Sequence, residues 1–131
     1  MNNRTRKEIE RLMLELFELQ VDVKDLGNTG LEAEELIPML EQRQQELEAL
    51  QRQVQVLADA EQTRYDALSE VKQCTDEGDA LQEAAGFLRE ASALNDGQIL
   101  ALVTSLQAGR PVDWNFDLTP YTDALDRARD F

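Results

Sequence analysis

The chain has 131 residues, of which 42% are hydrophobic, 31% are charged and only 5% are aromatic. This length accommodates one domain with a modest core, and the composition is typical of long helices and coiled coils. Acidic residues outnumber basic ones by 27 to 13, which gives a net charge of −14. Such a charge repels nucleic acids and anionic membranes, so we expect neither as a direct partner and favour a basic protein.

Two residue types that often build catalytic and zinc sites, His and Cys, are absent or scarce. The sequence has no His, the commonest general base, and a single Cys, Cys74. A structural zinc site uses four Cys or His ligands, and Asp76, Glu77 and Asp79 lack the ligand spacing of a calcium loop. We therefore expect no enzyme activity, no catalytic residue, no cofactor and no metal.

The cysteine content and the hydropathy pattern indicate a compartment. A single Cys excludes a disulfide within the chain and is consistent with a reducing environment. No apolar run approaches the roughly 18 residues that span a bilayer, and the sequence MNNRTRKEIE lacks the pattern of a signal peptide. We expect a cytoplasmic protein.

The first predicted helix spans about residues 5–26. Thr5, followed three residues later by Glu8, forms a capping-box pattern for its start. Apolar residues then recur at alternating spacings of three and four, which is a heptad pattern. Its members are Ile9, Leu12, Leu16, Leu19, Val23 and Leu26. Met13 and Phe17 widen this stripe, and the Gly-Asn-Thr-Gly sequence that follows predicts the end of the helix.

The second predicted helix spans about residues 34–73 and is the longest. Pro38 indicates a kink or a true start nearby. From residue 40 a second heptad pattern continues to residue 71. Its apolar positions, which we interpret as a dimer seam, are Leu40, Leu47, Leu50, Val54, Leu57, Leu68 and Val71. Arg43, Glu61 and Arg64 fill the remaining positions, where charges set register and partner orientation at a cost in stability.

This long helix can pack in two ways. It forms either an antiparallel hairpin with the first helix or a homodimer with its own copy. A helix of this kind is about 50 Å long, at roughly 1.5 Å per residue. The first helix covers only part of that length, so we favour a homodimer.

Two shorter helices are predicted next, at about residues 79–94 and 96–108. A loop at residues 74–79 precedes the first of them, and Asp79 is in position to cap it. Apolar residues at helical spacing identify one buried face on each.

The last part of the chain changes in character. Between Pro111 and Pro120 apolar and polar residues alternate, which favours an extended segment with one apolar face. Thr119-Pro120 then begins a short helix that ends near residue 129. The predicted architecture is therefore all-α, with a helical hairpin or coiled coil in residues 1–110, comprising one long helix and two shorter C-terminal helices, and an extended aromatic tail with a short helix in residues 111–131.

The tail carries most of the aromatic side chains, and its role has two interpretations. Trp114, Phe116 and Tyr121 either fold back and complete a small core or anchor the chain in the groove of a partner. Aromatic anchors dominate the energetics of many interfaces. Both interpretations remain open at this point.

One stretch of the sequence resembles known proteins. Glu61-Gln62, then Tyr65-Asp66-Ala67-Leu68, then an acidic loop around Gly78 occur in that order, after a basic start at residues 6–10. The chain resembles, over about residues 50–95 and the N-terminus, small uncharacterised coiled-coil accessory proteins of phages and prophages. The loop departs from that family, because Cys74-Thr75-Asp76-Glu77-Gly78 replaces a more polar sequence that contains an arginine.

The resemblance implies a phage-encoded protein that acts in the bacterial cytoplasm. Small acidic phage proteins often block host enzymes or immune systems, so it implies an inhibitor of a bacterial host or defence protein. One way to act would be to mask a nucleic-acid-binding surface. The alternative is a structural or assembly adaptor within a larger phage or cellular complex. The candidate partner-binding residues, besides the three aromatic ones, are Arg64, Tyr65, Asp76 and Glu77.

Overall fold

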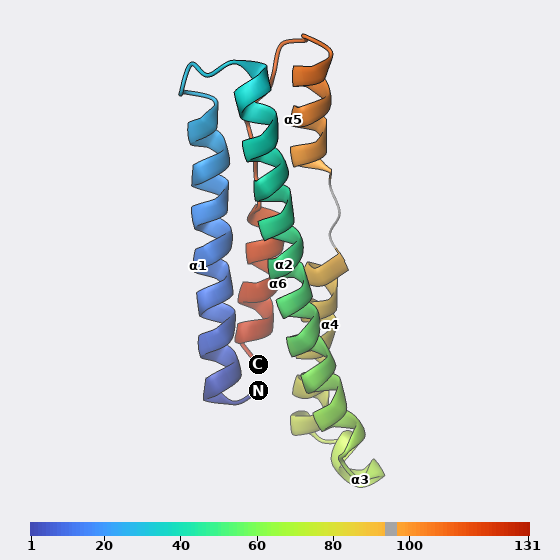
Figure 1. Ribbon diagram of the computed structural model, residues 1–131. Coiled ribbons are helices and arrows are strands. Elements are labelled where there is room, and N and C mark those ends of the chain that lie inside the picture. The colour runs from blue at the N-terminus through green and yellow to red at the C-terminus, as the bar shows by residue number, and fades with distance from the viewer. Residues whose placement is uncertain (94–96) are drawn as a thin grey trace.

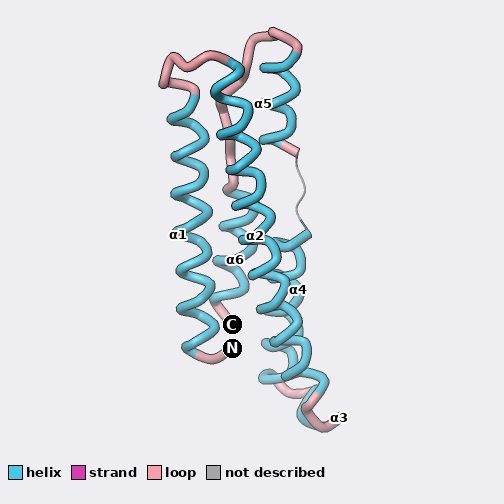
Figure 2. Tube along the Cα trace, in the orientation of Figure 1, coloured by secondary structure: helices cyan, strands magenta, loops and turns pink. Residues whose placement is uncertain are grey.

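The computed structural model describes residues 1–93 and 97–131, and these residues contain six helices and no strand (Figures 1 and 2). The helices are α1 (Asn3–Leu26), α2 (Ala33–Asp66), α3 (Glu70–Gln73), α4 (Asp76–Ala93), α5 (Gln98–Gln107) and α6 (Thr119–Arg129). The prediction of an all-α fold is confirmed. Residues 94 and 96, which we placed in the third and fourth helices, lie outside the described residues.

The helices form an elongated bundle around α2. Figure 1 shows α1 and α2 as an antiparallel hairpin, with α4 along the half of α2 nearest α3 and α5 along the other half. Helix α6 packs against both α1 and α4. The two chain ends meet at one end of the bundle, where the Met1 ammonium donates a hydrogen bond to the Phe131 carbonyl (3.3 Å).

Helix α1 begins two residues earlier than predicted, because its cap is a different residue. The backbone N–H of Thr5 donates to Oδ1 of Asn2 (2.8 Å), which makes Asn2 the N-cap. Thr5 itself lies in the first turn with a buried side chain. The capping box that we inferred from Thr5 and Glu8 is therefore wrong.

Helix α2 ends at Asp66 rather than near residue 73. Ser69 caps the short helix α3, and its hydroxyl accepts a hydrogen bond from the Lys72 N–H (3.4 Å). The turn into α4 is so tight that a Cβ on Gly78 would lie 2.4 Å from the carbonyl oxygen of Gln73. Only glycine allows this approach, and the resulting reversal lets α4 run back along α2.

The acidic residues that we assigned to a loop lie in a helix instead. Asp76, Glu77 and Asp79 all lie in the first turn of α4, where the helix dipole favours negative charge. Asp79 is not the cap that we predicted, because the hydroxyl of Thr75 accepts the hydrogen bond from the Gly78 N–H (3.4 Å). The helix therefore starts three residues earlier than expected.

Most of the predicted dimer seam is buried inside one chain. Leu40, Leu47, Leu50 and Val54 belong to a single hydrophobic core, and Leu57 packs against it from a half-buried position. The other helices contribute Ile9, Leu12, Leu16, Leu19 and Val23 from α1, Leu88 and Ala91 from α4, and Ile99, Leu102 and Val103 from α5. Helices α4 and α5 thus cover the part of α2 that α1 leaves free, so the reason for expecting a dimer through this seam no longer holds.

The last two seam residues take no part in that core. Leu68 and Val71 lie beyond the end of α2, and Val71 is 79% exposed on α3. A heptad spacing that continues past the end of a helix no longer describes one face of it. The two residues therefore do not continue the heptad face of α2, and their assignment to a dimer seam stays a prediction.

The aromatic tail completes the core. Phe116 and Leu118 of the extended segment and Tyr121 of α6 are buried, and the alternation of apolar and polar residues matches alternating buried and exposed positions. The Trp114 ring packs on Gly27, where a Cβ would lie 2.5 Å from the ring. The structure therefore places Phe116 and Tyr121 in the core rather than on an arm that binds a partner.

Glutamine side chains form the backbone hydrogen bonds of the extended segment that a neighbouring strand would form in a sheet. Gln98 accepts a hydrogen bond from the Asp117 N–H (2.8 Å) and donates one to the Asp117 carbonyl (2.6 Å). Gln20 of α1 accepts a hydrogen bond from the Leu118 N–H (2.7 Å). The Asp117 carboxylate accepts hydrogen bonds from the hydroxyl and the N–H of Thr119, and these lower the pKa of Asp117. The backbone of an extended segment is thus paired without a strand.

We predict a large difference between two phenylalanines. Phe116→Ala should lower the free energy of unfolding by about 3–5 kcal/mol, because it opens a cavity in the core. Phe17→Ala, at an exposed position of α1, should change it by less than about 0.5 kcal/mol. Urea denaturation of both variants measures the difference. Equal losses would contradict the placement of the tail in the core.

Candidate functional site

The structure brings together only two of the sequence-predicted partner residues outside the aromatic tail. Arg64 and Glu77 line the same open hollow of about 510 Å³ at the end of the bundle where the chain termini meet. The other lining residues are Met1, Asn2, Ala67, Leu68 and Leu81. Tyr65 and Asp76 do not line it, so the predicted set does not form one surface.

Arg64 has a structural partner beneath this hollow. Glu61, one turn earlier on α2, is fully buried, and its Oε1 accepts a hydrogen bond from Nη1 of Arg64 (2.7 Å). Its Oε2 has no hydrogen-bond partner within the described part of the chain. Burying a carboxylate costs free energy unless it is paired. Arg64 thus stabilises a charge that the core would otherwise exclude.

The structure shows where the residues considered for catalytic and metal chemistry lie. Cys74 is exposed, and no group of three or more His, Cys, Asp or Glu side chains within residues 1–93 and 97–131 is arranged to hold a metal ion. No helix of the described chain is both long and apolar enough to cross a membrane.

The outer face of α1 carries an apolar stripe. Leu14 and Phe17 are each 58% exposed and Val21 is 37% exposed. Their spacing of three and four residues places them on one side of the helix. The opposite side of α1 supplies the buried core residues, so α1 is apolar on two faces. A helix with a single partner layer normally has a polar outer face, and this stripe is the exception that marks a candidate site.

An acidic groove lies beside the stripe. It has a volume of about 310 Å³ and runs between α1 and α2. Its lining consists of Glu15, Glu18, Leu19 and Asp22 from α1 and Glu46, Ala49, Leu50 and Gln53 from α2. Leu19 and Leu50 are buried core residues, so the groove combines an apolar floor with four carboxylates. Glu18 follows Leu14 by one helical turn, which makes the stripe and the groove continuous.

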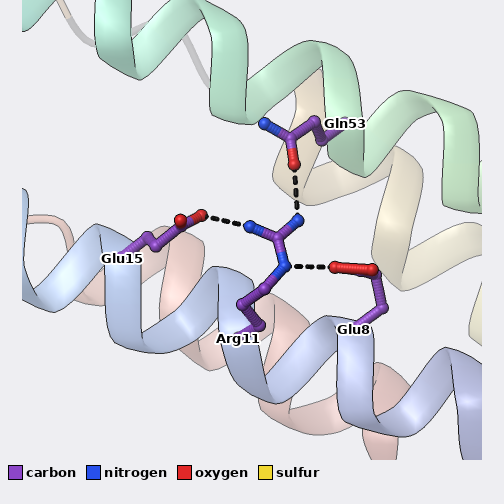
Figure 3. A network of polar contacts seen from close by, with 4 residues as sticks. All are labelled: Glu8, Arg11, Glu15 and Gln53. Carbon is purple, nitrogen blue, oxygen red and sulfur yellow. Dashed lines mark hydrogen bonds and ion pairs between the residues drawn. The ribbon is translucent and has the colours of Figure 1, made fainter.

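Arg11 joins α1 to α2 at one end of this surface (Figure 3). Its guanidinium donates hydrogen bonds to Glu8, to Oε2 of Glu15 (2.6 Å) and to Oε1 of Gln53 on α2 (2.6 Å). The hydrogen bond to Glu8, with the charge of Glu15, raises the pKa of Arg11 above its ordinary value. Arg11 therefore pairs with Glu15 while sharing its single positive charge with Glu8.

Arg43 pairs with a second carboxylate of the groove, that of Glu46. Its Nη1 contacts both carboxylate oxygens of Glu46 (2.8 and 2.9 Å). Within the described residues, Glu18 and Asp22 form no ion pair with a basic side chain. Glu18 and Asp22 are thus the two carboxylates of the groove that the described residues leave without an ion pair.

Sequence analysis missed this surface because it assigned Phe17 to the buried stripe. Phe17 was expected to widen the heptad face, but it lies on the opposite side of the helix together with Leu14 and Val21. The signal was present in the sequence. Leu14, Phe17 and Val21 have their own spacing of three and four, separate from the heptad that begins at Ile9.

Comparison of the sequence with models of known protein families, with curated proteins and with solved structures gives no significant match. The surface of α1 and α2 and the hollow at Arg64 are therefore interpreted from their own geometry.

We predict that Arg64 stabilises the fold through Glu61. Arg64→Ala should lower the free energy of unfolding by about 2 kcal/mol, because it leaves the carboxylate buried without a cation. Adding Glu61→Gln should recover most of this loss, since the buried charge is then gone. Urea denaturation of the two single variants and the double variant measures the coupling.

Arg52→Ala is the matched control, because Arg52 is exposed on the same helix; it should change stability by less than about 0.5 kcal/mol. A double variant that is less stable than Arg64→Ala alone would show that Glu61 is stabilised by something other than Arg64.

Proposed function

We propose that this chain is a non-enzymatic, acidic interaction protein that binds another protein through the outer face of α1. The observation that carries the proposal is the exposure of Leu14, Phe17 and Val21 side by side on a helix whose opposite face is already buried. Removal of apolar surface from water is favourable by about 25 cal/mol per Å², against which the entropy cost of association counts. The stripe therefore gives a partner a source of binding free energy that the folded chain does not use itself.

The narrower form of the proposal concerns the identity of the partner. The resemblance to small phage proteins supports a bacterial host or defence protein, which this chain would bind and block in the cytoplasm. The net charge of −14 supports a partner with a basic surface, such as one that binds nucleic acid. Masking of that surface is then the proposed mode of inhibition.

We predict that one substitution on α1 removes partner binding. Phe17→Glu places a charge in the centre of the stripe and should abolish stoichiometric capture of the partner from a bacterial lysate. Its thermal unfolding should match that of the unmodified chain, because the side chain is exposed. Capture by the immobilised chain, followed by a purified one-to-one complex, is the measurement.

Val71→Glu is the control, since it adds the same charge at another exposed apolar residue, on α3. Equal capture by the Phe17→Glu variant would disprove α1 as the binding site. A captured protein that keeps its full activity in the complex would favour the alternative function, an assembly adaptor, over an inhibitor.

A further inference from the structure

The shape of the α1 surface is suited to a helix. Leu14, Phe17 and Val21 extend over two helical turns, or roughly 10 Å at 1.5 Å per residue. Their spacing forms a ridge of the kind that packs into the groove of another helix. An amphipathic helix docks by presenting its own side chains at intervals of three and four residues. A helix is therefore the simplest element whose apolar positions match this ridge.

The adjoining groove is suited to a long cationic side chain. Its floor is apolar, with Leu19, Ala49 and Leu50, and carboxylates surround it. Lys and Arg bury an aliphatic stem against apolar surface while the charged end remains polar. A volume of about 310 Å³ beside the stripe leaves space for such a stem. The groove thus favours a basic residue next to the apolar positions of the docked helix.

The carboxylates of the groove that form no ion pair are negative, as binding of a cationic side chain requires. Arg11 pairs with Glu15 and Arg43 pairs with Glu46. Glu18 and Asp22 remain available to a partner. Both lie on the side of α1 between the stripe and α2, because Asp22 follows Glu18 by one turn and both line the groove. A helix on the stripe would bring its flanking residues over these carboxylates.

A second copy of the chain fits this surface less well. It would bring its own Glu18 and Asp22 to an interface that already has both, and each copy carries a net charge of −14. Like charges placed together cost free energy and disfavour the pairing. The electrostatics of the groove favour a partner with the opposite charge.

We infer that the occupant of this surface is a basic amphipathic helix of a partner protein, with apolar residues on Leu14, Phe17 and Val21 and a Lys or Arg side chain in the groove at Glu18 and Asp22. The inference rests on the proposed function and specifies the chemistry of the partner. A partner of this kind also gives the exposed apolar stripe of this acidic chain a role in binding. Apolar contacts provide affinity, and the flanking charges select the partner.

Two synthetic helical peptides test the inference on the full-length chain. Both carry the same Leu face, and one is flanked by Lys and the other by Glu. Calorimetry should detect one-to-one binding of the Lys peptide only, and Phe17→Glu should abolish it. The double variant Glu18→Gln/Asp22→Asn should weaken binding by about tenfold, because the exposed ion pairs with the basic side chain are lost. It should also reduce the dependence of affinity on salt.

The double variant Glu83→Gln/Glu90→Gln is the charge-matched control, since both residues are exposed on α4. It removes the same charge from the chain and should leave the Lys peptide bound as before. Equal loss in the control would overturn the inference, because binding would then follow net charge rather than the groove. Binding of both peptides, or of neither, would overturn it as well.

The same variants separate this inference from the proposed function. If Phe17→Glu abolishes capture of the cellular partner but the Lys peptide does not bind, the proposed function stands and the basic helix is wrong. If the Lys peptide binds but Phe17→Glu still captures the partner, the proposed function fails. A mass of twice 14.9 kDa in light scattering that Phe17→Glu reduces to 14.9 kDa would show a second copy on the stripe, and would overturn the inference.

Discussion

The arrangement of the whole chain depends on covering the apolar face of α2. This helix has 34 residues, and its buried positions extend from Leu36 to Glu61. A single antiparallel neighbour covers one side of such a face, so the remaining side must be covered by other elements. In this chain α4 covers one half and α5 the other, and the tail returns to place α6 against α1 and α4. The order of the helices follows from this requirement.

The same requirement explains the extended segment. Helix α5 ends at one end of the bundle, while α6 packs in the other half (Figure 1). An extended chain covers more distance per residue than a helix, at about 3.3 Å against 1.5 Å. It also presents alternate side chains to one side, so Phe116 and Leu118 face the core while the glutamines of α1 and α5 satisfy the backbone. An alternating sequence therefore forms an ordered segment without a sheet.

The sequence was sufficient to predict five of the six described helices, but not the separate helix α3 and not which helices pack together. Periodicity predicted the end of α1 at residue 26, and Pro120 predicted the start of α6. A heptad pattern is the same, however, whether a helix packs on its copy or inside a bundle of its own chain. The end of α2 was missed because Ala67 and Leu68 contain no break, and the turn depends on a close approach by Gly78 that only the tertiary structure reveals.

The candidate site also depends on packing that the sequence alone does not reveal. Periodicity identifies two apolar stripes on α1, but the packing of α2 and α6 decides which of them is buried. The buried stripe contains Ile9, Leu12 and Leu16, and the exposed one contains Phe17. The groove itself could not be predicted, because its carboxylates come from two helices, although the ion pairs of Glu15 and Glu46 follow from spacings of four and three residues within each helix.

Charge and burial together give α1 its two different faces. The face toward the core is held by apolar packing and by the Arg11 contacts to α2, and it is fully used within the chain (Figure 3). The outer face combines apolar side chains with carboxylates that have no cation within the described chain. Neither feature contributes to the core, and an exposed apolar stripe is unfavourable in water. A partner that supplies apolar and cationic side chains in the same geometry would bind both features at once, which is why we propose the outer face of α1 as the binding surface.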